Sequence, residues 1–242
     1  MRVVPDDAST LTVPALFCGP PTSGNGGWTS GALAAVLDPS GEAPVRVRLR
    51  RPPPLDVPLG LVADGAGLSA RHGEDVVAEA VRADVAPETV EAVPADVARA
   101  AEARYAGLTS HPFPTCYVCG TGRAPGDGMR IFPGRVDDDT EGRVRVAATW
   151  TPEQDADPAT AWAALDCVGG WAGDLGERLM VLGTITAQVR ELPRAGVEHV
   201  VVGGARGAEG RRTSTASTLW AEGRPIATAE HVWVAVAPEA VR

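Results

Sequence analysis

The sequence contains no lysine, so its 22 basic residues are all arginines, and 31 acidic residues give a net charge of −9. Excess negative charge repels phosphate backbones and argues against nucleic-acid binding. No apolar run approaches the ~18 residues that a membrane-spanning helix needs. Residues 1–9 are polar and lack the apolar centre of a signal peptide. We therefore expect a cytoplasmic protein that binds neither nucleic acid nor membranes.

Cysteine is scarce, because four residues in a chain of 242 do not make a disulfide framework. Cys116 and Cys119 are separated by two residues and followed by glycine, which resembles half of a zinc knuckle. A structural zinc site needs four ligands, for which His111 is a possible third and Cys18 or Cys167 a possible fourth. The sequence is compatible both with bound zinc and with free thiols at these cysteines. We expect no other cofactor.

The sequence Gly-Gly-Trp occurs twice, at residues 26–28 and 169–171. Each copy precedes a stretch with helical patterning and then a strand that ends at a proline. Each half of the chain finishes on a predicted hairpin. A repeat at about half the chain length indicates two copies of one fold in tandem. The chain is long enough for two ordinary domains.

Hydrophobic periodicity predicts one or two short helices and several strands in each copy. Residues 45–50 alternate apolar side chains with arginine, which is typical of a strand with one buried face. Asp157-Pro158 resembles a helix start, with Asp as cap and Pro in the first turn. We predict helices over residues 28–37, 95–106, 158–165 and 172–182. We predict strands over residues 45–50, 59–63, 70–75, 76–85, 143–150, 185–189, 197–202, 212–220 and 225–236.

These elements predict an α+β protein. We place an N-terminal repeat with a connector helix at residues 1–108, a Pro-, Gly- and Cys-containing linker at 109–136, and a C-terminal repeat at 137–242. A helix lying across antiparallel strands buries its apolar face. Open sheet edges invite pairing, so we expect the two copies to join edges into one continuous curved sheet.

This organisation resembles the double form of the hotdog fold, in which a curved antiparallel sheet wraps around a central helix. The resemblance covers roughly residues 15–85 and 143–236, and rests on the two glycine sequences and the final hairpin at 219–236. It implies a thioesterase that acts on an acyl-CoA or acyl-carrier thioester. It also implies a monomeric pseudo-dimer or a homo-oligomer.

In hotdog thioesterases of the phenylacetyl-CoA type, a His-Gly-Gly precedes the helix and a carboxylate lies two turns into it. The glycine N–H groups polarise the thioester carbonyl, and the carboxylate from the facing copy activates water or attacks directly. The resemblance places Asn25, Gly26 and Gly27 at the His-Gly-Gly, with asparagine in place of histidine. Counting seven residues past Gly27 gives Ala34 at the carboxylate position.

In the second copy, the resemblance places Gly169 and Gly170 at the glycine loop, and the same count gives Glu177 as the catalytic acid. Two other acids compete with it. Asp174 lies one turn before Glu177, and Asp166 resembles the aspartate of double-hotdog acyl-CoA thioesterases. In that branch a glutamine on a late strand assists, and Glu230 lies near its place.

Three functions follow from these residues. Thioester hydrolysis is favoured by the glycine loop of one copy and the acid of the other. A noncatalytic acyl or CoA-ester binder is the alternative, because the loop histidine is missing. An enoyl-CoA hydratase or dehydratase usually needs an Asp and His pair, which neither predicted helix contains.

Overall fold

The structure, a computed structural model, describes residues 10–241, so the expectation for residues 1–9 falls outside it. The helices are α1 (Gly26–Leu37), α2 (Ala95–Glu102) and α3 (Pro158–Ala172). The strands are β1 (Thr10–Leu11), β2 (Val45–Leu49), β3 (Leu59–Asp64), β4 (Gly67–His72), β5 (Asp75–Arg82), β6 (Gly134–Val136), β7 (Arg145–Trp150), β8 (Met180–Val189), β9 (His199–Glu209), β10 (Arg212–Ala221) and β11 (Arg224–Ala235).

The strands form one antiparallel sheet in the order β1-β3-β4-β5-β2-β8-β11-β10-β9-β7-β6. Its two halves meet where β2 pairs with β8, with Val45 opposite Ala187 and Val47 opposite Ile185. Moving outward from this seam, β5, β4, β3 and β1 on one side correspond in order to β11, β10, β9 and β7 on the other. The expectation of a single large antiparallel sheet in an α+β protein is confirmed.

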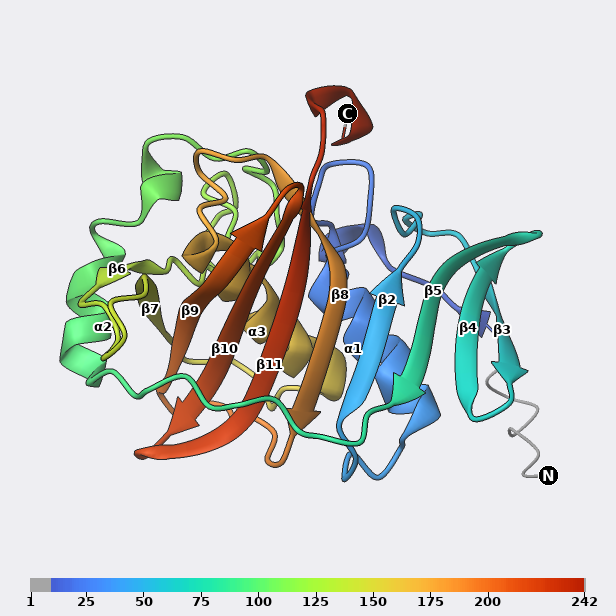
Figure 1. Cartoon of the computed structure of the whole chain (residues 1–242), viewed down its shortest axis with the longest axis horizontal. Coiled ribbons are helices and arrows are strands. Elements are labelled where there is room, and N and C mark those ends of the chain that lie inside the picture. Colours follow the sequence, from blue (N-terminus) through green and yellow to red (C-terminus); the bar gives the residue numbers. More distant parts are fainter. Residues whose placement is uncertain (1–9, 242) are drawn as a thin grey trace.

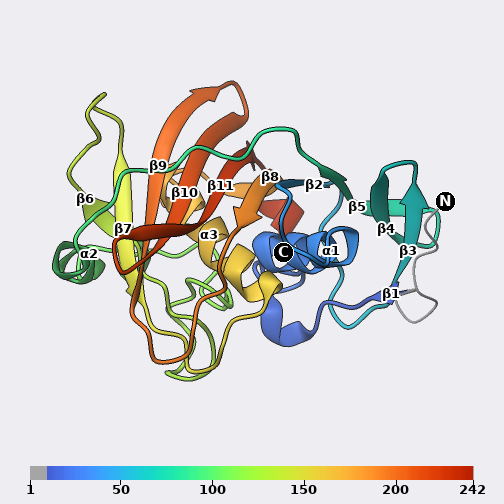
Figure 2. The ribbon, with the colours of Figure 1, turned by 90° about the horizontal axis from the view of Figure 1, so that it is seen from below.

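Helices α1 and α3 lie side by side on the same face of the curved sheet (Figures 1 and 2). Glycines allow this close approach. A Cβ added at Gly27 would stand 2.4 Å from Cβ of Asp166, and one at Gly31 would stand 2.7 Å from Cβ of Trp162. Real Cβ atoms do not come this close, so the absence of side chains on α1 sets the helix spacing.

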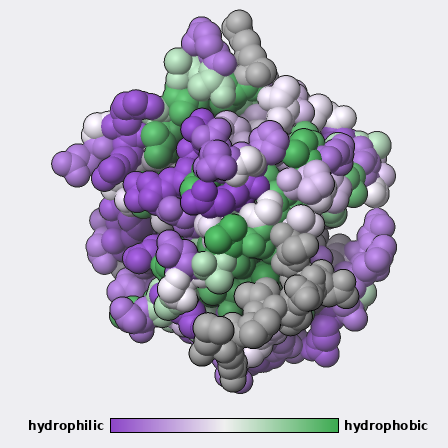
Figure 3. All heavy atoms as spheres, turned by 90° about the vertical axis from the view of Figure 1, so that its right-hand side faces the viewer, coloured by the Kyte–Doolittle hydropathy of each residue, from purple (hydrophilic) through white to green (hydrophobic). Residues whose placement is uncertain are grey.

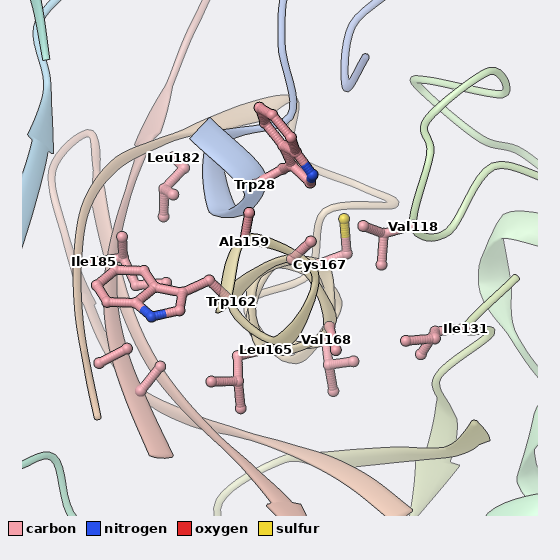
Figure 4. Packing of buried hydrophobic residues seen from close by; sticks show 14 of the residues in the cluster. Trp28, Val118, Ile131, Ala159, Trp162, Leu165, Cys167, Val168, Leu182 and Ile185 are labelled. Atoms are coloured by element: carbon pink, nitrogen blue, oxygen red, sulfur yellow. The ribbon is translucent and has the colours of Figure 1, made fainter. Parts of the chain in front are cut away.

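Helix α3 runs without interruption through the second Gly-Gly-Trp, so the predicted break there and the predicted helix over residues 172–182 are wrong. Asp157 caps it by accepting the Thr160 N–H at 2.7 Å. Trp162 and Leu165 project from it among buried side chains of the sheet (Figure 4). The next element after Ala172 is a turn, and β8 follows.

The glycines near the end of α3 are required by packing. A Cβ added at Gly169 would lie 2.7 Å from Nδ1 of His231, and one at Gly170 would lie 3.0 Å from the Trp233 ring. Glycine inside a helix costs about 1 kcal/mol relative to alanine. Packing against β11 overrides that local cost, and this is why the sequence pattern misled the prediction.

His231, beneath Gly169, predicts a measurable pH dependence of stability. Burial lowers its pKa to about 4, and Nδ1 lies 3.3 Å from the Thr215 hydroxyl. Since the fold favours the neutral ring, this stabilisation is complete above the unfolded pKa of about 6.5 and is lost as the pH falls toward 4. Between pH 7 and 4.5, wild type should lose about 2.5 kcal/mol more unfolding free energy than His231→Gln. Urea titrations at both pH values measure this, and parallel losses would contradict it.

Helix α2 packs on β6, β7 and β9, at the end of the sheet farthest from β1. Its predicted span was too long by one turn, because it ends at Glu102. The segment predicted as a linker contains β6 and also bonds to the loop before α1, since the Tyr117 N–H donates to the Cys18 carbonyl at 2.8 Å. The boundaries at residues 108 and 136 stay predictions.

The surface at the β3 and β4 end of the sheet is mainly polar around a smaller hydrophobic area (Figure 3). Val62 on β3 belongs to the large hydrophobic residues exposed to solvent. Among residues 10–241, no helix combines the length and hydropathy that crossing a membrane requires.

Candidate functional site

The amino end of α1 is the centre of the site. Asn25 is its N-cap, and its Oδ1 accepts the Trp28 N–H at 2.8 Å. Gly26 follows as the first helical residue. The early N–H groups of a helix have no partner inside it and carry partial positive charge. The expectation that the first glycine sequence begins a helix is confirmed.

Asp166 of α3 reaches this helix end. Its Oδ2 accepts the Gly27 N–H at 2.8 Å, across 139 residues of sequence. The residue is only 2% exposed, and Oδ1 has no hydrogen-bond partner within the described chain. Burial raises the pKa of Asp166 to about 7, while the bond from Gly27 and the nearby Asn25 side chain oppose the shift. One carboxylate oxygen of Asp166 is therefore fixed by α1, and the other is without a hydrogen-bond partner. Its pKa near 7 lets the carboxylate take up or release a proton at neutral pH.

A cavity of about 350 Å³ opens beside these groups. Asn25, Gly26 and Asp166 contribute polar groups to its wall, and most of the remaining lining is apolar. The exposed Arg50 and Arg51 also border it. The apolar part includes Leu49, Phe113, Leu175, Met180, Leu182, Trp233 and Val236.

Three buried cysteines border the same cavity. The sulfur atoms of Cys116, Cys119 and Cys167 all lie within 4.8 Å of one another, and those of Cys116 and Cys167 are 3.6 Å apart. The Asn25 amide donates toward Cys167 Sγ at 3.6 Å and toward Cys116 Sγ at 3.9 Å. Cys167 projects from α3 toward the segment that carries Val118 (Figure 4).

His111, the possible third ligand beside Cys116 and Cys119, does not point its ring nitrogens at their sulfur atoms. Its Nδ1 accepts the Phe113 N–H at 2.9 Å, and its Nε2 lies 3.0 Å from the Cys119 carbonyl. Both nitrogens are therefore occupied by the backbone. Cys18 points its thiol to the Thr115 carbonyl instead. Cys167 is the third member of the cluster.

The other predicted acids lie outside the cavity. Glu177 and Asp174 are exposed in the turn after α3, where Asp174 has a φ of 72°. The expectation that Glu177 lies on a helix facing Gly27 is wrong, because that helix does not exist. Glu230 is exposed on β11 between the buried Ala229 and His231, so it faces away from the helices.

Gly169 and Gly170 do not form a second glycine loop before a helix, because they lie three residues or fewer from the end of α3. The two helices can instead be aligned by their N-caps, Asn25 and Asp157. Eight residues after the first helical position, α1 has Ala34 and α3 has Asp166. The signal for this alignment was the Asp157-Pro158 helix start.

The amino end of α3 borders a smaller cavity of about 210 Å³. Ala34, Pro158 and Trp162 line it, and Ala34 occupies the position that corresponds to Asp166. Asp38 also borders it, but that carboxylate accepts the Ala43 N–H and the Arg82 guanidinium. The two ends of the helix pair are thus chemically unequal.

No protein-family model matches the chain. No curated protein matches it either. Among solved structures, a conserved protein of unknown function with hot dog fold from Alicyclobacillus acidocaldarius superposes with a TM-score of 0.62 at 16% identity, covering 95% of this chain and 93% of that one.

Two mycobacterial structures are also similar. The tesB protein MAP1729c of Mycobacterium avium subs paratuberculosis has a TM-score of 0.58 at 13% identity, over 98% of this chain and 91% of its own. The acyl-CoA thioesterase II TesB2 from Mycobacterium marinum has a TM-score of 0.56 at 12% identity, over 86% and 89%. At these identities the likeness concerns the fold, and the chain has the hotdog fold.

Proposed function

We propose that this protein hydrolyses an acyl thioester at the amino end of α1, with Asp166 as the general base. One observation carries the proposal. Asp166 is a buried carboxylate in the wall of an apolar cavity, fixed by a helix N–H, with its second oxygen unpartnered. Buried carboxylates with raised pKa values are characteristic of catalytic sites.

The proposal includes a tandem pair of hotdog units that share one sheet. Two observations support this arrangement: the order of strands outward from β2 repeats outward from β8, and helices α1 and α3 pack as a pair. In it, the first unit supplies the helix end and the second supplies the acid. The corresponding site at the end of α3 has Ala34 in place of the acid, so we expect one catalytic site per chain.

The amino end of α1 polarises the carbonyl group of the thioester. The Gly27 N–H is taken by Asp166 and that of Trp28 by Asn25, so Gly26, which borders the cavity, is the residue whose N–H can meet the carbonyl oxygen. Negative charge develops on this oxygen as water attacks. A donor at such a position is worth about 3 kcal/mol in comparable sites.

Asp166 removes a proton from a water molecule as the water oxygen bonds to the carbonyl carbon. The tetrahedral intermediate then collapses, the carbon–sulfur bond breaks and the thiolate leaves, taking up a proton. The products are a carboxylic acid and a free thiol. A pKa near 7 suits this role, because general bases work best with a pKa near the working pH.

Coenzyme A is the carrier we favour, because Arg50 and Arg51 border the cavity and their partners Glu79 and Asp75 are exposed. Ion pairs at the surface contribute little to stability, so the phosphate groups of coenzyme A can displace these carboxylates from the arginines. Replacing both arginines by alanine should raise KM for an acyl-CoA several-fold and leave kcat unchanged. The same acyl group on N-acetylcysteamine, which has no phosphate, should show no change. An equal effect on both substrates would contradict phosphate binding.

The proposed function is tested by thiol release from a panel of acyl-CoA esters, from acetyl to palmitoyl. We expect turnover with at least one ester, and faster turnover for acyl groups that fill the apolar cavity. Absence of thiol release from every ester, with folded protein, would overturn the proposal. Saturable thermal stabilisation without turnover would instead identify a noncatalytic ester-binding protein.

A further inference from the structure

The thiols of Cys116, Cys119 and Cys167 have the spacing of a metal site. With zinc–sulfur bonds of about 2.3 Å, two sulfurs of a tetrahedral site stand about 3.8 Å apart. The Cys116 and Cys167 sulfurs are 3.6 Å apart, and all three sulfurs fall within 4.8 Å. A small shift of side chains brings the three to the corners of one face of a tetrahedron.

The amino end of α1 contacts the cluster through one side chain. The Asn25 amide donates toward Cys116 and Cys167. Asn25 therefore joins the sulfur cluster to the amino end of α1, which it caps.

The three cysteines come from two separate segments. The 116–119 turn is closed by the Gly120 N–H, which donates to the Cys116 carbonyl at 2.9 Å. A Cβ at Gly120 would lie 2.4 Å from that oxygen, so the tight turn requires glycine. Cys167 comes from α3, one residue after Asp166. A metal ion would therefore fasten the loop onto the catalytic helix.

We propose that Cys116, Cys119 and Cys167 bind one zinc ion whose fourth coordination position opens into the cavity beside Asp166. All three cysteines border that cavity, and no fourth cysteine or histidine is directed at them in the described residues. Thiolate ligands select zinc over hard cations such as magnesium. Each coordinated thiol releases its proton to solvent. Water fills the fourth position in the free protein.

This proposal does not depend on thioester hydrolysis, since metal content is measured without substrate. Protein purified from zinc-supplemented cells under a reductant should contain about one zinc per chain by mass spectrometry. Cys116→Ser, Cys119→Ser and Cys167→Ser should each lower that content at least tenfold. Cys18→Ser and His111→Gln are the matched controls and should keep it.

A cobalt titration of the wild-type protein tests the site even if the cysteine variants fail to fold. Wild-type protein stripped with a chelator and titrated with Co²⁺ should develop thiolate-to-cobalt absorption that saturates at one ion per chain. Addition of 2-mercaptoethanol, a small free thiol whose access needs no acyl-CoA site, should change that spectrum because the fourth position is open. An unchanged spectrum would refute the open position. Folded wild type that takes up neither zinc nor cobalt would overturn the whole proposal.

Discussion

Replacement of Asp166 by asparagine is expected to lower kcat for the preferred acyl thioester by about 10²–10⁴, the usual contribution of a general base. Asparagine has nearly the same shape, and its carbonyl oxygen can still accept the Gly27 N–H that Asp166 accepts at 2.8 Å. The fold and KM should therefore change little. Steady-state thiol release gives kcat and KM separately.

Glu177→Gln is the matched control for this prediction. It removes an acid of the same copy that lies exposed in the turn after α3, away from the cavity. Its kcat should equal that of wild type. Loss of activity in Glu177→Gln with retention in Asp166→Asn would contradict the assignment and restore the alternative acid.

Replacement of Gly27 by alanine is expected to lower the free energy of unfolding by about 2 kcal/mol and to lower kcat as well. The new Cβ would stand 2.4 Å from Cβ of Asp166 and 2.8 Å from the Trp162 carbonyl. Both groups belong to the rigid helix α3, so α1 must move, and overpacking of this kind costs about 1–3 kcal/mol. The same movement separates Gly27 from the Asp166 carboxylate.

Gly60→Ala provides the comparison, because a Cβ there meets no atom closer than 4.0 Å and the residue lies on β3, far along the sheet. Urea denaturation should show wild-type stability within about 0.5 kcal/mol for this variant. If Gly27→Ala retains both stability and activity, the close contact between the helices does not hold the site together.

The strands were predictable because their periodicity survives in the sheet. Residues 45–50 alternate buried valine and exposed arginine as expected, and the hairpins at the ends of both copies form. The one-sheet arrangement followed from the open edges of each copy. What periodicity could not give was the extension of β9 to Glu209, since its glycines carry no pattern.

The glycine repeat was the main source of error. In α1 the Gly-Gly pair begins the helix, whereas in α3 it lies near the end, packed against His231 and Trp233. The same tripeptide thus serves two different packing needs. Only the residues that each glycine pair contacts in the fold distinguish the two cases, and those contacts cannot be read from the sequence. Alignment by helix cap places Asp166, and not Glu177, at the position of α3 that corresponds to Ala34 of α1.

The site was predictable only in part. Asn25, Gly26 and Gly27 were expected at a helix end, and they lie there. Asp166 was one of three acids, and its choice depends on a hydrogen bond that spans 139 residues. Cys167, 51 residues from Cys116, was one of three possible partners of the short cysteine motif, and only the fold distinguishes it from His111 and Cys18.

A crystal structure of Asp166→Asn with its acyl-CoA substrate bound would show whether the amino end of α1 is the one catalytic site of the chain. We predict one acyl group per chain in the cavity at the amino end of α1. Its carbonyl oxygen should lie within hydrogen-bond distance of the Gly26 N–H, and residue 166 should face the carbonyl carbon through one water molecule. An acyl group bound at the amino end of α3 beside Ala34, or a carbonyl turned away from α1, would contradict hydrolysis at the amino end of α1 by Asp166.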